Sequence, residues 1–151
     1  MSEQTIQVFT DGVTRYFNLV SGSDVKIGSP YLVDNTNPAA FDYTGIIGIT
    51  GPYKGLVYFT APRVLLRHLL ISMGESDTNL ENIMDVVGEV ANTISGNARS
   101  NFGSEFMISV PSTTQGAPSA AQLPAQLRSF VIPIYWKSYH AAVVVCLQQL
   151  H

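Results

Sequence analysis

The sequence predicts an α/β fold, more closely α+β, in which six largely antiparallel strands form a sheet that packs against three helices. Apolar residues recur at three- and four-residue steps near the start of the chain and in its middle third, which is typical of helices. Runs rich in β-branched and aromatic residues lie around these segments, which is typical of strands. The 151 residues contain no internal repeat and no strong linker, so a single domain over residues 1–151 is expected.

An N-terminal helix opens the expected fold. Its apolar face is formed by residues spaced three or four apart, namely Ile6, Phe9, Val13, Phe17 and Val20. Gly22 is well placed to end this helix, because glycine readily adopts the left-handed conformation of a C-terminal cap. Residues 24–33 are expected to form the first strand, which ends near Val33. The next two strands, Tyr43–Thr50 and Gly55–Thr60, are joined by a link short enough for a hairpin.

Two longer helices are expected next. The first follows Thr60-Ala-Pro62, because proline is tolerated in the first turn of a helix, and it stops at Gly74. Its buried side is expected to comprise Val64, Leu65, Leu69 and Met73. The second runs from about residue 79 to residue 101, and Thr78 and Glu81 have the Thr-x-x-Glu spacing of a capping box at its start.

Three further strands complete the predicted sheet. One is expected over Glu105–Val110, and the last two over Arg128–Trp136 and Tyr139–Leu147. The intervening segment Ser112–Gln126 is rich in Ser, Ala, Pro and Gln, which is typical of a surface loop. Short links between strands favour antiparallel pairing.

Charge and cysteine content argue against several classes of protein. The sequence has eight Lys and Arg and 11 Asp and Glu, for a net charge of -3. The Lys and Arg residues form no basic stripe, so nucleic-acid binding is not expected. The single cysteine, Cys146, cannot form a disulfide within the chain, which fits a reducing compartment. Its apolar run Ala141–Leu147 is too short to span a bilayer, and the N-terminus lacks the features of a signal peptide. We therefore expect a cytoplasmic protein without membrane insertion.

The long helix has a clear apolar side and a clear polar side. At about 100° per residue, one side collects the apolar residues Leu80, Ile83, Val87, Val90, Ile94 and Ala98. The opposite side, here called the polar stripe, comprises Thr78, Glu81, Asp85, Glu89, Asn92, Gly96 and Arg99. Glu89 and Asn92 are three residues apart, so both side chains project from one patch.

Most polar helix faces are simply solvated, and two glycines favour a more specific role here. Gly88 and Gly96 lie within the helix, where each costs up to about 1 kcal/mol relative to alanine. Gly96 is on the polar stripe, one turn beyond Asn92, and leaves space for the backbone of another molecule. Gly88 is explained equally well by helix packing.

The string DVVGEVANTISGNA over residues 85–98 closely resembles the signature helix of the CheX-like chemotaxis phosphatases, which belong to the CheC/CheX/FliY superfamily. The centre of that signature is Glu-x-x-Asn, here Glu89 and Asn92. The hairpin region Tyr43–Gly55 is also similar, and the order of elements matches over nearly the whole chain. CheC-like relatives carry two such helices. This chain has one, because the similar spacing in Asp34–Asn37 is expected in a turn, so the resemblance is to CheX.

The resemblance implies a phosphatase acting on the aspartyl phosphate of a phosphorylated CheY-like receiver domain, and a homodimer joined through the sheets. The receiver holds Mg²⁺, so no metal or cofactor is implied on this chain. Asn92 would orient the attacking water through a carboxamide that does not repel the phosphoryl oxygens. Glu89 would meet a lysine of the receiver. Asp85, Gly96 and Arg99, on the same stripe, are expected to bind the partner.

Other phosphatase chemistries lack their motifs. Cys146 is not followed by the Cys-x5-Arg pattern, no phosphate-binding Gly-x4-Gly-Lys loop is present, and His68, His140 and His151 lack metal-ligand spacing. Two other hypotheses remain. One is a non-enzymatic module that binds a phosphorylated receiver without turnover, and the other is a structural or regulatory domain that merely keeps the fold.

Overall fold

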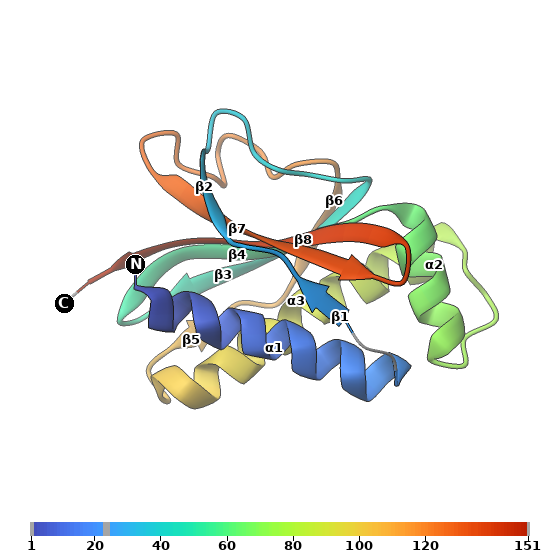
Figure 1. Ribbon diagram of the computed structural model, residues 1–151. Coiled ribbons are helices and arrows are strands. Elements are labelled where there is room, and N and C mark those ends of the chain that lie inside the picture. The colour runs from blue at the N-terminus through green and yellow to red at the C-terminus, as the bar shows by residue number, and fades with distance from the viewer. Residues whose placement is uncertain (1, 23–24, 151) are drawn as a thin grey trace.

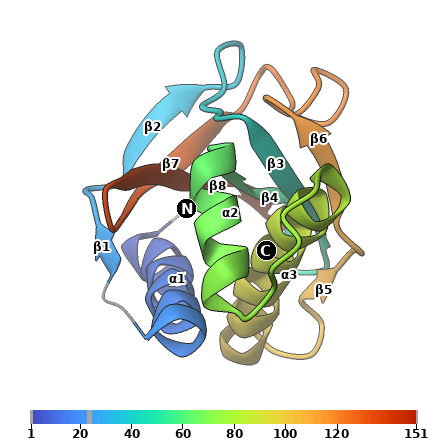
Figure 2. The same cartoon turned by 90° about the vertical axis from the view of Figure 1, so that its right-hand side faces the viewer.

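The computed structural model describes residues 2–22 and 25–150. Within these ranges it has three helices and eight strands, and the strands form one antiparallel sheet. The helices lie on one side of the sheet, as Figures 1 and 2 show from two directions. The expected α/β architecture is therefore confirmed.

The sheet has four long strands and a pair of short strands along each edge. The long strands are β3 (Tyr43–Thr50), β4 (Tyr53–Ala61), β7 (Arg128–Trp136) and β8 (Tyr139–Gln149), which pair in the order β7-β8-β4-β3. The short strands are β1 (Val25–Ile27) and β2 (Tyr31–Asp34) on β7, and β5 (Met107–Ile108) and β6 (Ser112–Gln115) on β3. The described sheet is thus six strands wide, although it has eight separate strands where six were expected.

Local sequence explains why the β7 edge is divided. The Gly28 N–H still donates to the Pro133 carbonyl oxygen, at 2.9 Å, but Pro30 has no N–H to donate, so the chain leaves the ladder between β1 and β2. The expectation of one strand over residues 24–33 is therefore wrong, and residue 24 itself lies outside the described residues.

The β3 edge also differs from expectation. The expected strand Glu105–Val110 is reduced to the two residues of β5. The expected loop Ser112–Gln126 begins with the strand β6, which pairs with residues 43–46 of β3. β6 has the polar sequence STTQ, and its extended form depends on hydrogen bonds from β3 rather than on its own composition.

The N-terminal helix ends as expected. α1 (Glu3–Ser21) begins after Ser2, whose side chain accepts from the Thr5 N–H at 3.2 Å. It ends at Gly22, whose φ of 65° is left-handed. Phe9, Val13 and Phe17 of its apolar face are fully buried against the sheet and the other helices.

The middle helix is shorter than expected and is turned differently. α2 (Arg63–Ser72) has 10 residues, fewer than the 19 of α1, so the expectation of a longer helix is wrong here. Its buried side consists of Leu65, Leu66, Leu69 and Leu70. Val64 and Met73, which were expected to be buried, are 56% and 40% exposed. Four leucines in two adjacent columns bury more apolar area than the face through Val64, so they set the rotation of the helix.

The long helix is α3 (Leu80–Phe102), which has 23 residues. Its N-cap is Asn79, whose side-chain oxygen accepts from the Asn82 N–H at 2.9 Å. The capping box expected from Thr78 is therefore wrong, because Thr78 lies one residue before the cap. Leu80, expected on the apolar side, is 45% exposed since the first turn extends beyond the core.

The face of the sheet opposite the helices is covered by loops. A smaller apolar cluster lies there, formed by side chains such as Ile46, Tyr58, Val144 and Cys146. Asn35 sits in the turn expected over Asp34–Asn37 and is buried. Its Nδ2 donates to the Pro124 carbonyl oxygen at 2.8 Å, and its Oδ1 accepts from the Ser129 hydroxyl. These bonds tie the turn to the loop at Pro124 and to β7 over this face.

No helix among the described residues is both long enough and apolar enough to span a membrane.

Candidate functional site

The polar stripe predicted on the long helix faces solvent. Glu89, Asn92, Asp85 and Arg99 are exposed, and Gly96 is half-buried. The opposite side of α3 is buried, including Ile83, Val87, Val90, Ile94 and Ala98. The structure therefore brings together all five residues that the sequence assigned to the site, on one surface of one helix.

Most polar side chains of the stripe, Glu89 and Asn92 among them, have no hydrogen-bond or ion-pair partner within the described part of the protein. Neither the Glu89 carboxylate nor the Asn92 carboxamide forms a hydrogen bond or an ion pair with another described residue. Arg99 is partly committed, because its Nη2 donates to the Ser104 carbonyl oxygen at 3.1 Å. Glu89 and Asn92 are thus free to bind groups of another molecule.

One flank of the stripe is formed by α1, which runs antiparallel to α3. The ring centroids of Phe9 and Phe102 are 6.2 Å apart, and a Cβ on Gly12 would lie 3.5 Å from the Ile94 carbonyl oxygen. Tyr16 is one turn further along α1, toward Glu89. Two helices therefore meet along a seam that ends beside the stripe.

Tyr16 connects this seam to Glu89 electrostatically. Its hydroxyl is buried and has no hydrogen-bond partner among the described residues. Burial raises the pKa of Tyr16 well above its ordinary value, and the negative charge of Glu89 raises it further. The sequence did not single out Tyr16, because it lies 73 residues before Glu89 and its aromatic ring fits the apolar pattern of α1.

The sheet contacts α3 on the buried side of the helix, at β3. A Cβ on Gly45 would lie 2.3 Å from the Val87 carbonyl oxygen and 2.8 Å from the Gly88 Cα. Such a separation is impossible for any side chain, so β3 touches the backbone of α3 directly. This close approach fixes the depth at which α3 lies on the sheet, and hence the height of the stripe above it.

The two glycines of α3 have different surroundings. A Cβ on Gly88 would lie 3.1 Å from Thr113 Cγ2 and 3.3 Å from Pro111 Cβ, whereas the nearest atom to a Cβ on Gly96 is Ile108 Cδ1, at 4.0 Å. Gly88 is therefore explained by packing against the edge strand. Gly96 has open space on the stripe, as the sequence indicated.

The stripe can bind a cationic group more readily than an anionic one. Glu81, Asp85 and Glu89 place three carboxylates on its first three turns, and Arg99 is near its end. Within the described residues, no group of three or more His, Cys, Asp and Glu side chains is arranged to hold a metal ion. A phosphoryl group would approach this surface only together with positive charge that its own carrier supplies.

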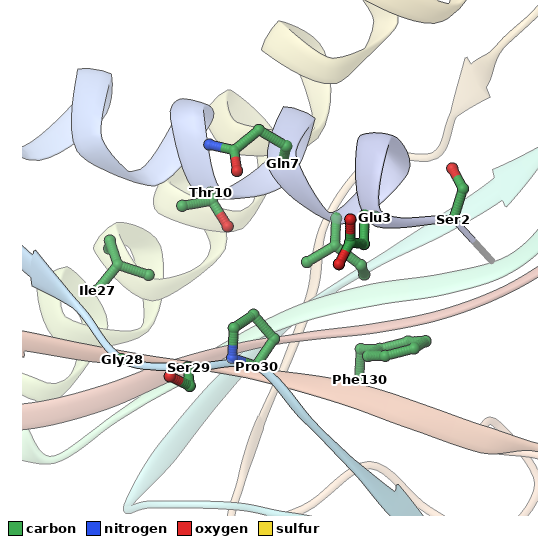
Figure 3. A pocket seen from close by; sticks show the side chains of 10 residues that line it. Ser2, Glu3, Gln7, Thr10, Ile27, Gly28, Ser29, Pro30 and Phe130 are labelled. Atoms are coloured by element: carbon green, nitrogen blue, oxygen red, sulfur yellow. The ribbon is translucent and has the colours of Figure 1, made fainter.

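Other candidates for chemistry lie elsewhere. The His68 Nδ1 lies 3.1 Å from the Tyr139 hydroxyl, His140 packs edge-on against Tyr135, and His151 lies outside the described residues. Cys146 is buried in the sheet. A cavity of about 620 Å³ lies between the start of α1 and the β1–β2 link, lined by Glu3, Pro30 and Phe130 among others (Figure 3). None of these residues is on the polar stripe.

Comparison with known families decides the identity of the fold. The family model described as chemotaxis phosphatase CheX matches residues 43–135, more than half of the chain and including the whole of α3. The chain belongs to the CheX family. Among curated protein sequences, none matches this CheX-family chain.

Solved structures agree with this assignment over nearly the full length. A CheC-like superfamily protein from Shewanella sp. PV-4 has a TM-score of 0.82 at 25% identity, covering 98% of this chain and 99% of its own. The chemotaxis protein CheX from Desulfovibrio desulfuricans has a TM-score of 0.81 at 25% identity, covering 96% and 99%. The CheX-CheY-BeF3-Mg²⁺ complex from Borrelia burgdorferi gives a TM-score of 0.76 at 16% identity, covering 96% and 98%, and thus shares the fold.

Proposed function

We propose that this CheX-family protein removes the phosphoryl group from the aspartyl phosphate of a CheY-like receiver domain. The observation that carries the proposal is the exposed, unpartnered pair Glu89 and Asn92 on α3, within the segment that matches the CheX family. The Borrelia burgdorferi CheX, which has the same fold, is found in a complex with CheY, BeF3 and Mg²⁺. A receiver domain is therefore the partner that best fits the polar stripe.

Asn92 acts on the attacking water in this proposal. Its carboxamide oxygen accepts a hydrogen bond from the water and directs the oxygen at phosphorus, in line with the bond that breaks. A P–O bond forms to water as the P–O bond to the aspartate breaks. The aspartate leaves as a carboxylate, and the water's proton goes to the phosphate. An uncharged amide suits this position, because it does not repel the phosphoryl oxygens.

Glu89 acts by positioning the two proteins. A carboxylate beside a phosphoryl group is repelled unless a cation lies between them. The family resemblance implies a lysine of the receiver in that place, with which Glu89 forms a charge-assisted hydrogen bond. The exposed carboxylate of Asp85 and the guanidinium of Arg99 lie on the same stripe, and we assign them to binding the receiver's surface around its phosphorylated site.

The reaction uses Mg²⁺ that the receiver carries. Asp85 and Glu89 are two exposed carboxylates on one helix, which make a weak and mostly hydrated site for a hard cation. Calorimetry of this protein alone with Mg²⁺ or Mn²⁺ is expected to give no tight binding. A micromolar site that is destroyed by Glu89→Gln would instead indicate a metal-assisted hydrolase.

A homodimer is the second part of the proposal. Tyr31 and Leu32 of the edge strand β2 are exposed large hydrophobic residues, and an uncovered edge strand readily pairs with another chain. Light scattering is expected to give twice the chain mass. A receiver-directed role also places the protein in the cytoplasm.

The test of the proposed function is phosphate release from phosphorylated receiver domains of the same organism, measured over time with and without this protein. At least one receiver should lose phosphate faster. A receiver that binds but keeps its phosphate would assign a non-catalytic binding module instead. Equal binding of phosphorylated and unphosphorylated receivers, without turnover, would reduce the chain to a structural domain.

A further inference from the structure

The edge strand beside α3 is interrupted by a β-bulge. In β5, Ile108 pairs with Ile49, and the Ser109 N–H donates to the Gly48 carbonyl oxygen at 2.9 Å. In β6, Ser112 pairs with Ile46. One residue of β3, Ile47, therefore lies opposite two residues of the edge strand, Val110 and Pro111, which is the arrangement that defines a bulge.

Side-chain hydrogen bonds hold this bulge in place. Pro111 has no N–H and cannot join the ladder. The Ser109 hydroxyl accepts from the Gly48 N–H at 2.8 Å and donates to the Val110 carbonyl oxygen at 2.9 Å. Backbone groups that the bulge removes from regular pairing are satisfied in this way, so the bulge is a built feature of the edge.

The bulge places Val110 level with Asn92. Ile108 lies beside Gly96 and Pro111 lies beside Gly88, at 4.0 Å and 3.3 Å from a Cβ on each glycine. Val110 comes between Ile108 and Pro111 along the edge, and Asn92 lies one turn from each glycine along α3. The edge strand and the helix thus run side by side, with Val110 and Asn92 at the same height.

Val110 is 85% exposed, more than any other large hydrophobic residue in the described part of the chain. A β-bulge commonly re-aims a side chain beside a functional site. A molecule large enough to carry a phosphoryl group to Asn92 also covers the edge strand at this height. Burial of one valine by such a partner raises affinity on the order of tenfold.

We propose that Val110 is a docking residue for the receiver domain, which buries this side chain when its phosphoryl group reaches Asn92. This inference rests on the function proposed above and adds a specificity residue to it. Polar groups on α3 act on the phosphoryl group and on the receiver's lysine, while Val110 supplies an apolar contact at the border of the site. An apolar contact of this kind selects receivers by surface shape, independently of the phosphoryl chemistry that they share.

A second copy of this chain fits the bulge less well. Strand addition needs a regular row of backbone donors and acceptors along the edge. Here Pro111 has no N–H to offer, and the Val110 carbonyl oxygen already accepts from the Ser109 hydroxyl. The receiver is therefore the occupant that the geometry favours.

The test compares Val110→Ser with Val64→Ser. Val64 is an exposed valine on α2 and serves as the matched control. The probe is a CheY-like receiver domain of the same organism, loaded with BeF3 and Mg²⁺ for binding and phosphorylated for turnover. Val110→Ser is expected to raise Kd and KM about tenfold, with the same kcat at saturating receiver and the same Tm. Val64→Ser should match the wild type, and Val110→Ile should retain affinity.

Equal affinity of Val110→Ser and the wild type would overturn the inference, and so would a loss of kcat at unchanged KM. Loss of dimer mass with unchanged receiver binding would assign Val110 to a second copy of the chain. If the wild type binds the receiver without turnover, the proposed catalysis fails while a weaker Kd for Val110→Ser still supports the docking role. If it binds no receiver, both proposals fail.

Discussion

The buried side of α3 and its polar stripe contribute different things to the protein. On the buried side, the β3 backbone at Gly45 touches the helix at Val87 with no room for a side chain. On the stripe, Glu89 and Asn92 are exposed and have no partner among the described residues. Packing and candidate chemistry are therefore separated on two sides of one helix, so substitutions on the two sides should separate stability from activity.

The largest effect is expected at the contact between sheet and helix. Gly45→Ala places a Cβ 2.3 Å from the Val87 carbonyl oxygen, so backbone must move, and the free energy of unfolding should fall by about 3 kcal/mol. Urea denaturation measures this loss. Gly48→Ala is the control on the same strand, because its Cβ would meet only the Ser109 side chain, at 3.4 Å. Equal stability of the two variants would contradict the account of this contact.

The next effect concerns function and not stability. Glu89→Ala should lower kcat/KM for receiver dephosphorylation about tenfold or more, because the receiver's lysine loses a charged partner. The free energy of unfolding should stay within about 0.5 kcal/mol, as for other exposed positions. Glu81→Ala, an exposed carboxylate two turns earlier on the stripe, is the control. If kcat/KM falls equally in both variants, the stripe acts through its total negative charge, and the assigned role of Glu89 is wrong.

A smaller effect distinguishes the two glycines of α3. Gly96→Ala should raise the free energy of unfolding by up to about 1 kcal/mol, because alanine favours the helix and its Cβ meets no close atom. The same change should weaken receiver binding if the partner's backbone uses that space. Gly88→Ala should bring no such gain, since its Cβ would press on Thr113 at 3.1 Å. Thermal unfolding and receiver titration of both variants make the comparison.

The smallest effect concerns pH. Burial, and then the charge of Glu89, raises the pKa of Tyr16 above 10.0 in the folded protein. The folded chain keeps a proton that the unfolded chain loses above about pH 10, so this contribution to stability is present below that pH and is lost as the pH rises. Tyr16→Phe should reduce the loss of stability between about pH 8 and about pH 10.5. Part of the loss of stability should remain in this variant, because burial also raises the pKa of Tyr58.

Long periodic elements were predictable from the sequence. The last hairpin begins and turns at the expected residues, and α3 begins and ends within about one residue of expectation, because each has a long pattern of one period. The face of α2 was not predictable, since Val64 and Leu65 are neighbours and only contact with the core decides which is buried. The β6 pairing depends on β3, far away in the sequence.

The candidate site was visible for a similar reason. Glu89 and Asn92 lie on one helix, so their spacing alone brings them together. The flanks of the site were not visible, because Tyr16 and Val110 come from α1 and from the edge strand. Val110 was expected as the last residue of a regular strand, and the proline that follows it was the one local sign of a bulge.

The most direct measurement is the turnover of the Asn92→Ala variant with a phosphorylated receiver in excess. Removal of the carboxamide takes away the group that holds the attacking water, so kcat should fall about 100-fold. Receiver affinity and Tm should stay close to those of the wild type, because Asn92 is exposed and has no partner among the described residues. Turnover by this variant at the wild-type rate would contradict the central claim that Asn92 positions the water.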